Sequence, residues 1–142
     1  MSETEEFNIV FEEPIAYQLS GGLQFIELAR KGVLKKAVLN LVQQSGLSFK
    51  TIAGLLPVSE RTLQRYSDTD RLAPDVSEHV ILFTQVFFRA EEVLGSRKKA
   101  KEWLQTPALS LGNKSPLSFL DTSFGAQYIM DELGRLEQGV FS

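Results

Sequence analysis

The chain has 142 residues and a formal net charge of −3, and its 43% hydrophobic and 23% charged composition is that of a soluble protein with a hydrophobic core. It contains no cysteine and one histidine, His79, so we expect no disulfide and no metal site. The start, MSETEEFN, lacks the basic residues of a secretory signal, and the most apolar window, residues 80–88, is half as long as a membrane span. We therefore expect a protein of the reducing cytoplasm with no membrane association.

Charge is spread unevenly along the chain. Residues 1–30 hold six acidic residues and one basic residue, residues 31–72 hold three and seven, and residues 73–142 hold nine and seven. Residues 1–20 are acidic and weakly patterned, which predicts a mobile N-terminal arm. Its apolar residues, available to pair with another surface, are Phe7, Ile9, Val10 and Phe11.

Two helices are predicted after this arm. The segment LQFIELARK lies between Gly22 and Gly32 and repeats apolar residues at helical spacing. The segment VLKKAVLNLVQQ, residues 33–44, does so more regularly, and Gly46 follows it as a residue suited to the left-handed position past a helix end. The second helix places one apolar face on Leu34, Ala37, Val38, Leu41 and Val42.

Residues 48–66, SFKTIAGLLPVSERTLQRY, predict two short helices joined by a three-residue turn. Ser48 and Ser59 are each placed as an N-cap, and Pro57 lies between the helices that they begin. The spacing of apolar and small residues fits a helix-turn-helix unit, in which the second helix packs on the first. The predicted interior positions are Ile52, Ala53, Leu56, Val58, Leu63 and Tyr66.

The second of these helices presents a basic outer face. At about 100° per residue, Arg61 and Arg65 lie opposite Leu63 and point away from the core. Arginine and glutamine on such a face are the side chains that read guanine and adenine in the major groove. The predicted DNA-contacting residues are Lys50, Ser59, Arg61, Thr62, Gln64 and Arg65. The alternative is a solvated basic face on a small helical bundle, because Pro57 stands where the generic motif prefers glycine.

A long helix is predicted from Pro74, and its middle is hydrophobic nearly all round. Such a helix is buried on more than one side, either by a subunit interface or as the central helix of a single core. The first alternative predicts a homodimer, and His79 beside this region is expected to be a packed or surface residue. The candidate dimer residues are Val80, Phe83, Phe87 and Phe88.

The C-terminal part reads as three helical segments. Gly95 ends the long helix, and Ser96 caps a short basic helix, SRKKAKEWL. A loop containing Pro107 and Gly112 follows, after which Ser115 and Pro116 open a short helix. Thr122 opens a last helix with one apolar face, Gly139 is expected to stop it, and residues 140–142 are expected to extend beyond. That face contains Ala126, Ile129, Leu133 and Leu136.

The order of small motifs over residues 100–140 resembles the C-terminal toxin-binding domain of the Xre/MbcA/ParS antitoxins. Upstream, FIELARKG, residues 46–66 and the following helix resemble the same family in the same order. Each motif is weak alone, and their order over about 120 residues is what is specific. The matching residues are Trp103 and Leu104, Pro107 and Leu109, Gly112 to Pro116, Leu117, Phe119 to Thr122, Gly125 and Ala126, and Leu133, Arg135, Glu137 and Gly139.

The resemblance implies an all-α protein that is the antitoxin of a type II toxin–antitoxin pair. Its partners would be a RES-domain toxin that consumes NAD and the operator DNA of its own operon. The expected organisation is an acidic arm at residues 1–20, a helix-turn-helix domain at residues 21–95 and a toxin-binding domain at residues 96–142, linked by the long central helix. The implied toxin-binding residues are Trp103, Pro116, Arg135, Gly139, Val140, Phe141 and Ser142.

In this family the C-terminal tail reaches the NAD pocket of the toxin, and EQGVFS is compatible with that role. Val140 and Phe141 supply apolar anchors, and Ser142 ends in a carboxylate suited to a cationic phosphate-binding residue. The alternative for these residues is a frayed terminus.

The sequence shows no catalytic constellation and no phosphate-binding glycine loop, so we expect no enzyme activity and no cofactor. Two other interpretations stay open. One is a transcriptional repressor whose C-terminal lobe only dimerises, and the other is an adaptor whose helix-turn-helix has lost DNA binding.

Overall fold

The computed structural model describes residues 3–12 and 17–141. Every regular secondary-structure element in these residues is a helix. This confirms the all-α prediction. In chain order the elements are α1 (Glu3–Phe11), α2 (Tyr17–Lys31), α3 (Lys35–Ser45), α4 (Phe49–Ala53), α5 (Glu60–Arg65), α6 (Pro74–Leu94), α7 (Arg97–Gln105), the 3-10 helices η1 (Leu109–Leu111) and η2 (Pro116–Phe119), and α8 (Ser123–Phe141). Among the helices that the structure describes, none is long and apolar enough to cross a bilayer.

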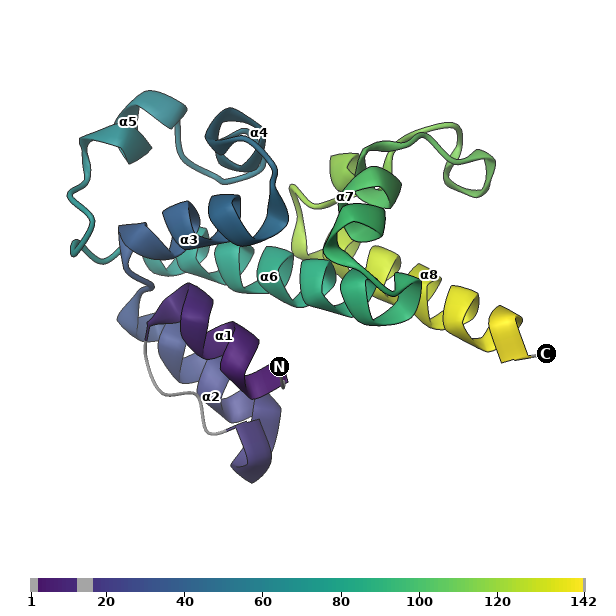
Figure 1. The fold of residues 1–142 in the computed structure, drawn as a ribbon. Coiled ribbons are helices and arrows are strands. Elements are labelled where there is room, and N and C mark those ends of the chain that lie inside the picture. Colours follow the sequence, from purple (N-terminus) through teal and green to yellow (C-terminus); the bar gives the residue numbers. More distant parts are fainter. Residues whose placement is uncertain (1–2, 13–16, 142) are drawn as a thin grey trace.

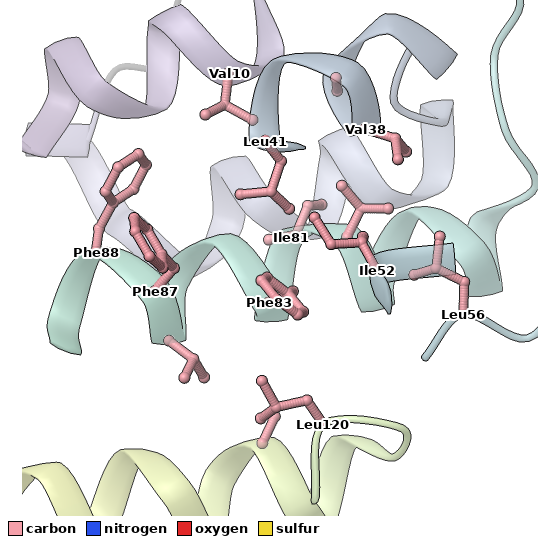
Figure 2. Close-up of a cluster of buried hydrophobic side chains, with 14 of the residues drawn as sticks. Val10, Val38, Leu41, Ile52, Leu56, Ile81, Phe83, Phe87, Phe88 and Leu120 are labelled. Atoms are coloured by element: carbon pink, nitrogen blue, oxygen red, sulfur yellow. The ribbon is translucent and has the colours of Figure 1, made fainter. Parts of the chain in front are cut away.

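Helix α6 runs through the middle of the molecule and is covered by other helices on several sides (Figure 1). It packs against α1, α2 and α3 of the N-terminal half and against α7 and α8 of the C-terminal half. Figure 2 shows Val10, Leu41 and Ile52 on one side of α6 and Leu120 on the opposite side. This arrangement explains why the middle of α6 is apolar nearly all round.

The predicted dimer face on α6 is wrong. Val80, Phe83, Phe87 and Phe88 are all buried within this one chain, at 0% to 4% exposed surface. The chain has enough further helices to cover every apolar side of α6, so the alternative of a central core helix is the one the structure supports. An apolar pattern reports burial, and it does not report whether the covering residues belong to the same chain.

The predicted mobile arm is also wrong for the residues that the structure describes. Helix α1 packs on α3 and buries Phe7, Val10 and Phe11 in the core. The Phe7 ring meets the rings of Phe25 and Phe88 edge to face, with centroids 5.2 and 5.6 Å away. A nine-residue helix has a short and weak pattern of its own, and it is contact with α3 and α6 that orders it.

Helix α2 begins at Tyr17, ahead of Gly22, and ends at Lys31 before Gly32, whose φ of 95° is left-handed. Helix α3 ends in the predicted way, because Gly46 has φ 75° and its N–H donates to the Val42 carbonyl.

His79 is a half-buried residue that joins the two halves of the molecule. Its ring nitrogens lie 2.8 Å from the Asp75 carbonyl oxygen, at the start of α6, and 3.0 Å from the Asp121 carbonyl oxygen, between η2 and α8. This position agrees with the expectation of a packed or surface residue.

The C-terminal half begins with α7 and closes with α8, which packs on α6 and η2. The predicted N-caps are present, because Ser96 accepts from the Lys99 N–H and Ser115 from the Ser118 N–H. The prediction that Gly139 stops the last helix is wrong, because α8 continues through it to Phe141. Glycine in a helix loses only about 1 kcal/mol relative to alanine, so one glycine does not have to end a helix.

Candidate functional sites

The segment α4–α5 is the helix-turn-helix unit that the sequence predicts. Ser48 Oγ accepts from the Thr51 N–H at 3.1 Å, and Ser59 Oγ accepts from the Thr62 N–H at 3.0 Å. Both predicted N-caps are therefore confirmed. The connection occupies residues 54–59 and is longer than the predicted three-residue turn, because α4 ends at Ala53 and α5 starts only at Glu60.

Burial divides this unit into an inner and an outer side. Ile52, Ala53 and Leu63 are buried, and Leu56 joins them. The outer side carries exposed residues on α5 and at the start of both helices. All six predicted DNA-contacting residues belong to it, namely Lys50, Ser59, Arg61, Thr62, Gln64 and Arg65. The structure thus offers a polar and basic face of the type that a recognition helix presents to DNA.

Lys35 holds the C-terminal end of α5, and the sequence analysis did not find this residue. It is only 9% exposed, and its Nζ donates to the Tyr66 carbonyl at 2.9 Å and to the Gln64 carbonyl at 3.4 Å. The last carbonyls of a helix have no partner within the helix, and a cation there also interacts favourably with the negative end of the helix dipole. The signal in the sequence was a lysine three positions before buried Val38, on the apolar face of α3.

The loop after α5 completes this attachment. Helix α3 has no side-chain N-cap, and its first N–H groups, on Lys35 and Lys36, donate to the Asp70 and Asp68 carbonyls at 2.8 and 3.0 Å. The Arg71 guanidinium donates to the Gly32 carbonyl at 2.7 Å. The start of α3 and the end of α5 therefore hold each other, which fixes α5 on the core.

The predicted toxin-binding residues divide into exposed and covered ones. Pro116 is buried and Trp103 is half-buried against the core, so both support the domain from inside. Arg135 and Gly139 are exposed on α8. The side chains of Val140 and Phe141, and all of Ser142, lie outside the described part of the chain.

The outer face of α8 carries an exposed aromatic row. Ala126, Ile129 and Leu133 are buried, whereas Phe124 is 89% exposed and Tyr128 46% exposed. Phe124, Tyr128 and Arg135 follow one another at helical spacings of four and seven, so they share the face opposite the core. The sequence analysis missed Phe124 and Tyr128, although the same spacing that defined the buried face was sufficient to find them.

Contacts from η2 and from α8 itself order this row. The Tyr128 ring stacks on the Phe119 ring with centroids 5.7 Å apart, and the Arg135 guanidinium lies 5.9 Å from the Tyr128 centroid. Arg135 Nη2 also donates to Glu132 at 2.7 Å. Gly125 makes the approach of η2 possible, because a Cβ there would overlap the Phe119 carbonyl oxygen.

A bidentate ion pair fixes the far end of α8 on α6. Arg89 Nη1 and Nη2 donate to the two Glu137 carboxylate oxygens at 3.0 and 2.8 Å. This hydrogen-bonded partner lowers the pKa of Glu137 and raises that of Arg89. Among the residues that the structure describes, no group of three His, Asp or Glu side chains is arranged to hold a metal ion.

Comparison with known families divides the chain in the same way as its structure. The antitoxin Xre-like helix-turn-helix domain matches residues 24–84, and the antitoxin Xre/MbcA/ParS C-terminal toxin-binding domain matches residues 89–139. The chain belongs to the Xre/MbcA/ParS antitoxin family. In this Xre-family chain α6 carries the end of the first domain and the start of the second, so one helix is shared between both cores.

Individual relatives agree with the family. A protein of Yersinia enterocolitica named Antitoxin Xre is 41% identical over 87 residues, which are 60% of this chain and 59% of the relative. A second Antitoxin Xre, from Photorhabdus laumondii, is 34% identical over 80 residues, which are 56% and 54% of the two chains. The match thus spans less than two thirds of either relative.

A solved structure shares the fold. The crystal structure of the M. tuberculosis MbcT–MbcA toxin–antitoxin complex contains a chain that superposes with a TM-score of 0.58 and 20% identity. The superposition covers 76% of this chain and 96% of that one.

Proposed function

We propose that this protein is the antitoxin of a type II toxin–antitoxin pair. The observation that supports this most is the succession of the two family domains on one chain, one with an exposed basic recognition helix and one with an exposed aromatic helix face. The toxin is proposed to be a RES-domain enzyme that degrades NAD. The chain itself acts by binding in the cytoplasm, and no catalytic activity is assigned to it.

Neutralisation is proposed to occur by occlusion of the NAD pocket with the C-terminal residues Gly139, Val140, Phe141 and Ser142. Helix α8 reaches Phe141 and is held on α6 by Arg89 and Glu137, so the end of the chain would be delivered by a rigid helix. This differs from the flexible tail that the sequence suggests, and it lowers the entropy lost on insertion. Arg135, one turn earlier, would contact the rim of the pocket, with Trp103 and Pro116 supporting the domain behind it.

The experiment is deletion of residues 139–142 in cells that express the toxin, with cellular NAD and growth as readouts. We expect loss of protection at unchanged antitoxin abundance, because a lost aromatic anchor at an interface commonly costs about 2 kcal/mol or more. Operator binding should be retained, since α5 lies at the opposite end of the molecule (Figure 1). Equal protection by the truncated and parent proteins would show that the tail is not the plug.

The operator is proposed to be read by α5, with Arg61 and Arg65 on base edges and Lys50 on phosphate. A chain of net charge −3 has little long-range attraction for DNA, so a homodimer that presents two recognition helices is the expected binding form. The buried face of α6 cannot form that dimer. Light scattering gives the mass of the protein–operator complex, and a complex that contains only one 15.9 kDa chain per operator duplex would contradict this part of the proposal.

The alternative function is a repressor whose C-terminal domain only dimerises. The exposed basic face of α5 is compatible with both functions. An adjacent reading frame whose product is toxic unless this chain is present would decide for the antitoxin.

A further inference from the structure

Helix α7 of the C-terminal half lies against the end of α3, beside the point where the helix-turn-helix unit begins. Arg97 on α7 donates to the Gln44 side chain on α3. One turn later the Lys101 side chain lies along Gly46, with its Cδ and Nζ 3.4 and 3.6 Å from the place that a Cβ on Gly46 would take. Ser48, the N-cap of α4, follows Gly46 closely in the chain. Lys101 belongs to the second family domain and therefore stands at the edge of the first.

The ammonium group of Lys101 has no anionic partner among the residues that the structure describes. Lys36, Arg89 and Arg97 each pair with a carboxylate at 2.8 to 3.0 Å. Lys101 does not, although it is half-buried and its stem is confined beside Gly46. The nearby end of α3 favours a cation electrostatically, but it leaves the N–H donors of Lys101 available to an acceptor outside the chain.

Lys50, exposed in the first turn of α4, is the next cation along this edge. Gly46 and Lys50 are at most about 14 Å apart, because they are separated by only four residues of chain. Each strand of B-DNA carries one phosphate for about every 3.4 Å along the axis. Phosphates of a single strand can therefore reach both Lys50 and Lys101.

The arrangement of the helices also suits one DNA strand along this edge. In helix-turn-helix proteins the first helix crosses the DNA backbone while the second enters the major groove. Those two helices are α4 and α5 here, and α7 stands on the same side of α6 as both of them (Figure 1). A backbone that passes the start of α4 would next meet the flank of α7 that carries Lys101.

We propose that Lys101 contacts an operator phosphate beside the one that Lys50 contacts, so that both domains of the chain hold the operator. The inference rests on the proposed reading of the operator by α5. It gives the domain described as toxin-binding a part in DNA binding. Charge favours DNA over an acidic segment of another protein, because residues 31–72, which include α4 and α5, hold seven basic and three acidic residues.

A phosphate contact has a signature that a base contact lacks. It strengthens binding to every DNA sequence alike and releases about one counterion, so its loss lowers the slope of log affinity against log salt by about 0.9. An arginine that reads a base changes the preference between sequences instead. Substitutions of Lys101 and of Arg61 should therefore differ in both readouts.

The test uses the full-length protein with a duplex of the DNA directly upstream of its own reading frame, and with a scrambled duplex of equal length. Fluorescence anisotropy over a series of salt concentrations gives the affinity and the slope. Lys101→Gln removes the charge and keeps most of the stem, whereas Lys101→Arg keeps the charge. Lys99→Gln is the matched control, because Lys99 is exposed on the same helix about 160° round from Lys101.

We expect Lys101→Gln to bind both duplexes about 5-fold more weakly at low salt, with a slope smaller by about one. Lys101→Arg and Lys99→Gln should behave as the parent does. Parent-like affinity and slope of Lys101→Gln would overturn the inference. An equal loss in Lys99→Gln would also overturn it, because net charge and not position would then be the cause.

Two further results would assign Lys101 another role. A loss that Lys101→Arg does not restore, together with lower stability in urea, would make Lys101 a residue that only packs α7 on α3. Weaker toxin binding with unchanged DNA binding would place it in the toxin interface. Failure of the parent protein to prefer the upstream duplex over the scrambled one would instead overturn the proposed operator binding.

Discussion

The two exposed faces of this molecule differ in chemistry and in what holds them. The outer face of α5 is basic and polar, and a buried lysine on α3 fixes its helix end. The outer face of α8 is aromatic, and a glycine contact with η2 fixes its first turn. Charged side chains suit a phosphate backbone and base edges, whereas exposed aromatics suit the apolar centre of a protein interface. The contrast supports the proposal that one chain binds two different classes of partner, one through each face.

The strongest test of the α8 side is Gly125→Ala. The added Cβ would overlap the Phe119 carbonyl oxygen, which is backbone and cannot move aside without shifting η2. We expect a loss of about 3 kcal/mol in the free energy of unfolding, together with impaired toxin binding. Urea denaturation measures the first effect.

The matched control is Gly134→Ala on the same helix, where an added Cβ meets no atom within 4 Å. Alanine there should raise stability by about 0.5 to 1 kcal/mol, because the helix interior favours it over glycine. Equal effects of the two substitutions would contradict the role given to Gly125.

On the α5 side, Arg61→Ala and Arg65→Ala should each weaken operator binding by about 1 to 3 kcal/mol if they read bases. Toxin binding should be unaffected, which separates the two faces. The control is Lys98→Ala, an exposed cation on α7. Fluorescence anisotropy at one fixed salt concentration compares the operator affinity of each variant with that of the parent. Parent-like operator affinity of the double variant would show that α5 does not contact the bases.

Lys35→Met should weaken operator binding by about 1 to 2 kcal/mol without removing a DNA contact. The substitution leaves the Gln64 and Tyr66 carbonyls without their donor, so the end of α5 is held less firmly. The slope of affinity against salt should equal that of the parent, because Lys35 is buried and releases no counterion from DNA. Lys50→Ala should reduce that slope. A reduced slope for Lys35→Met would mean that it touches phosphate directly.

The differences between prediction and structure follow from the range of the interactions involved. Ser48 and Ser59 were predictable because a cap is set by residues three positions apart. The burial of Phe7, the covering of Phe83 and the hydrogen bonds of Lys35 depend on helices distant in sequence. Periodicity indicated that α6 was buried on several sides and could not say by what. Gly139 was read as a helix stop, although tertiary contacts of α8 outweigh the weak preference of one glycine.

The smallest expected effect on stability concerns Glu6 on α1, and it depends on pH. Burial and the neighbouring Glu91 carboxyl raise the pKa of Glu6 from 4.5 to about 7. Arg97 donates to Glu91 at 2.8 Å and to Gln44, so α1, α3, α6 and α7 meet there. The folded state holds this proton more tightly than the unfolded state, so stability falls as pH rises from about 4.5 to about 7.

Glu6→Gln should remove this dependence and stabilise the protein at pH 8 by about 1 kcal/mol, a modest value because Glu6 is partly exposed and screened by solvent. The measurement is urea denaturation at pH 5 and pH 8, with Glu102→Gln as an exposed control. An unchanged pH dependence in Glu6→Gln would place its origin elsewhere.

We propose that this chain neutralises a RES-domain toxin by direct contact. The most direct measurement is NAD consumption by the purified toxin during titration with the full-length protein. We expect inhibition that is complete at a fixed molar ratio and that is lost when residues 139–142 are removed. Undiminished NAD consumption in the presence of excess full-length protein would contradict the claim.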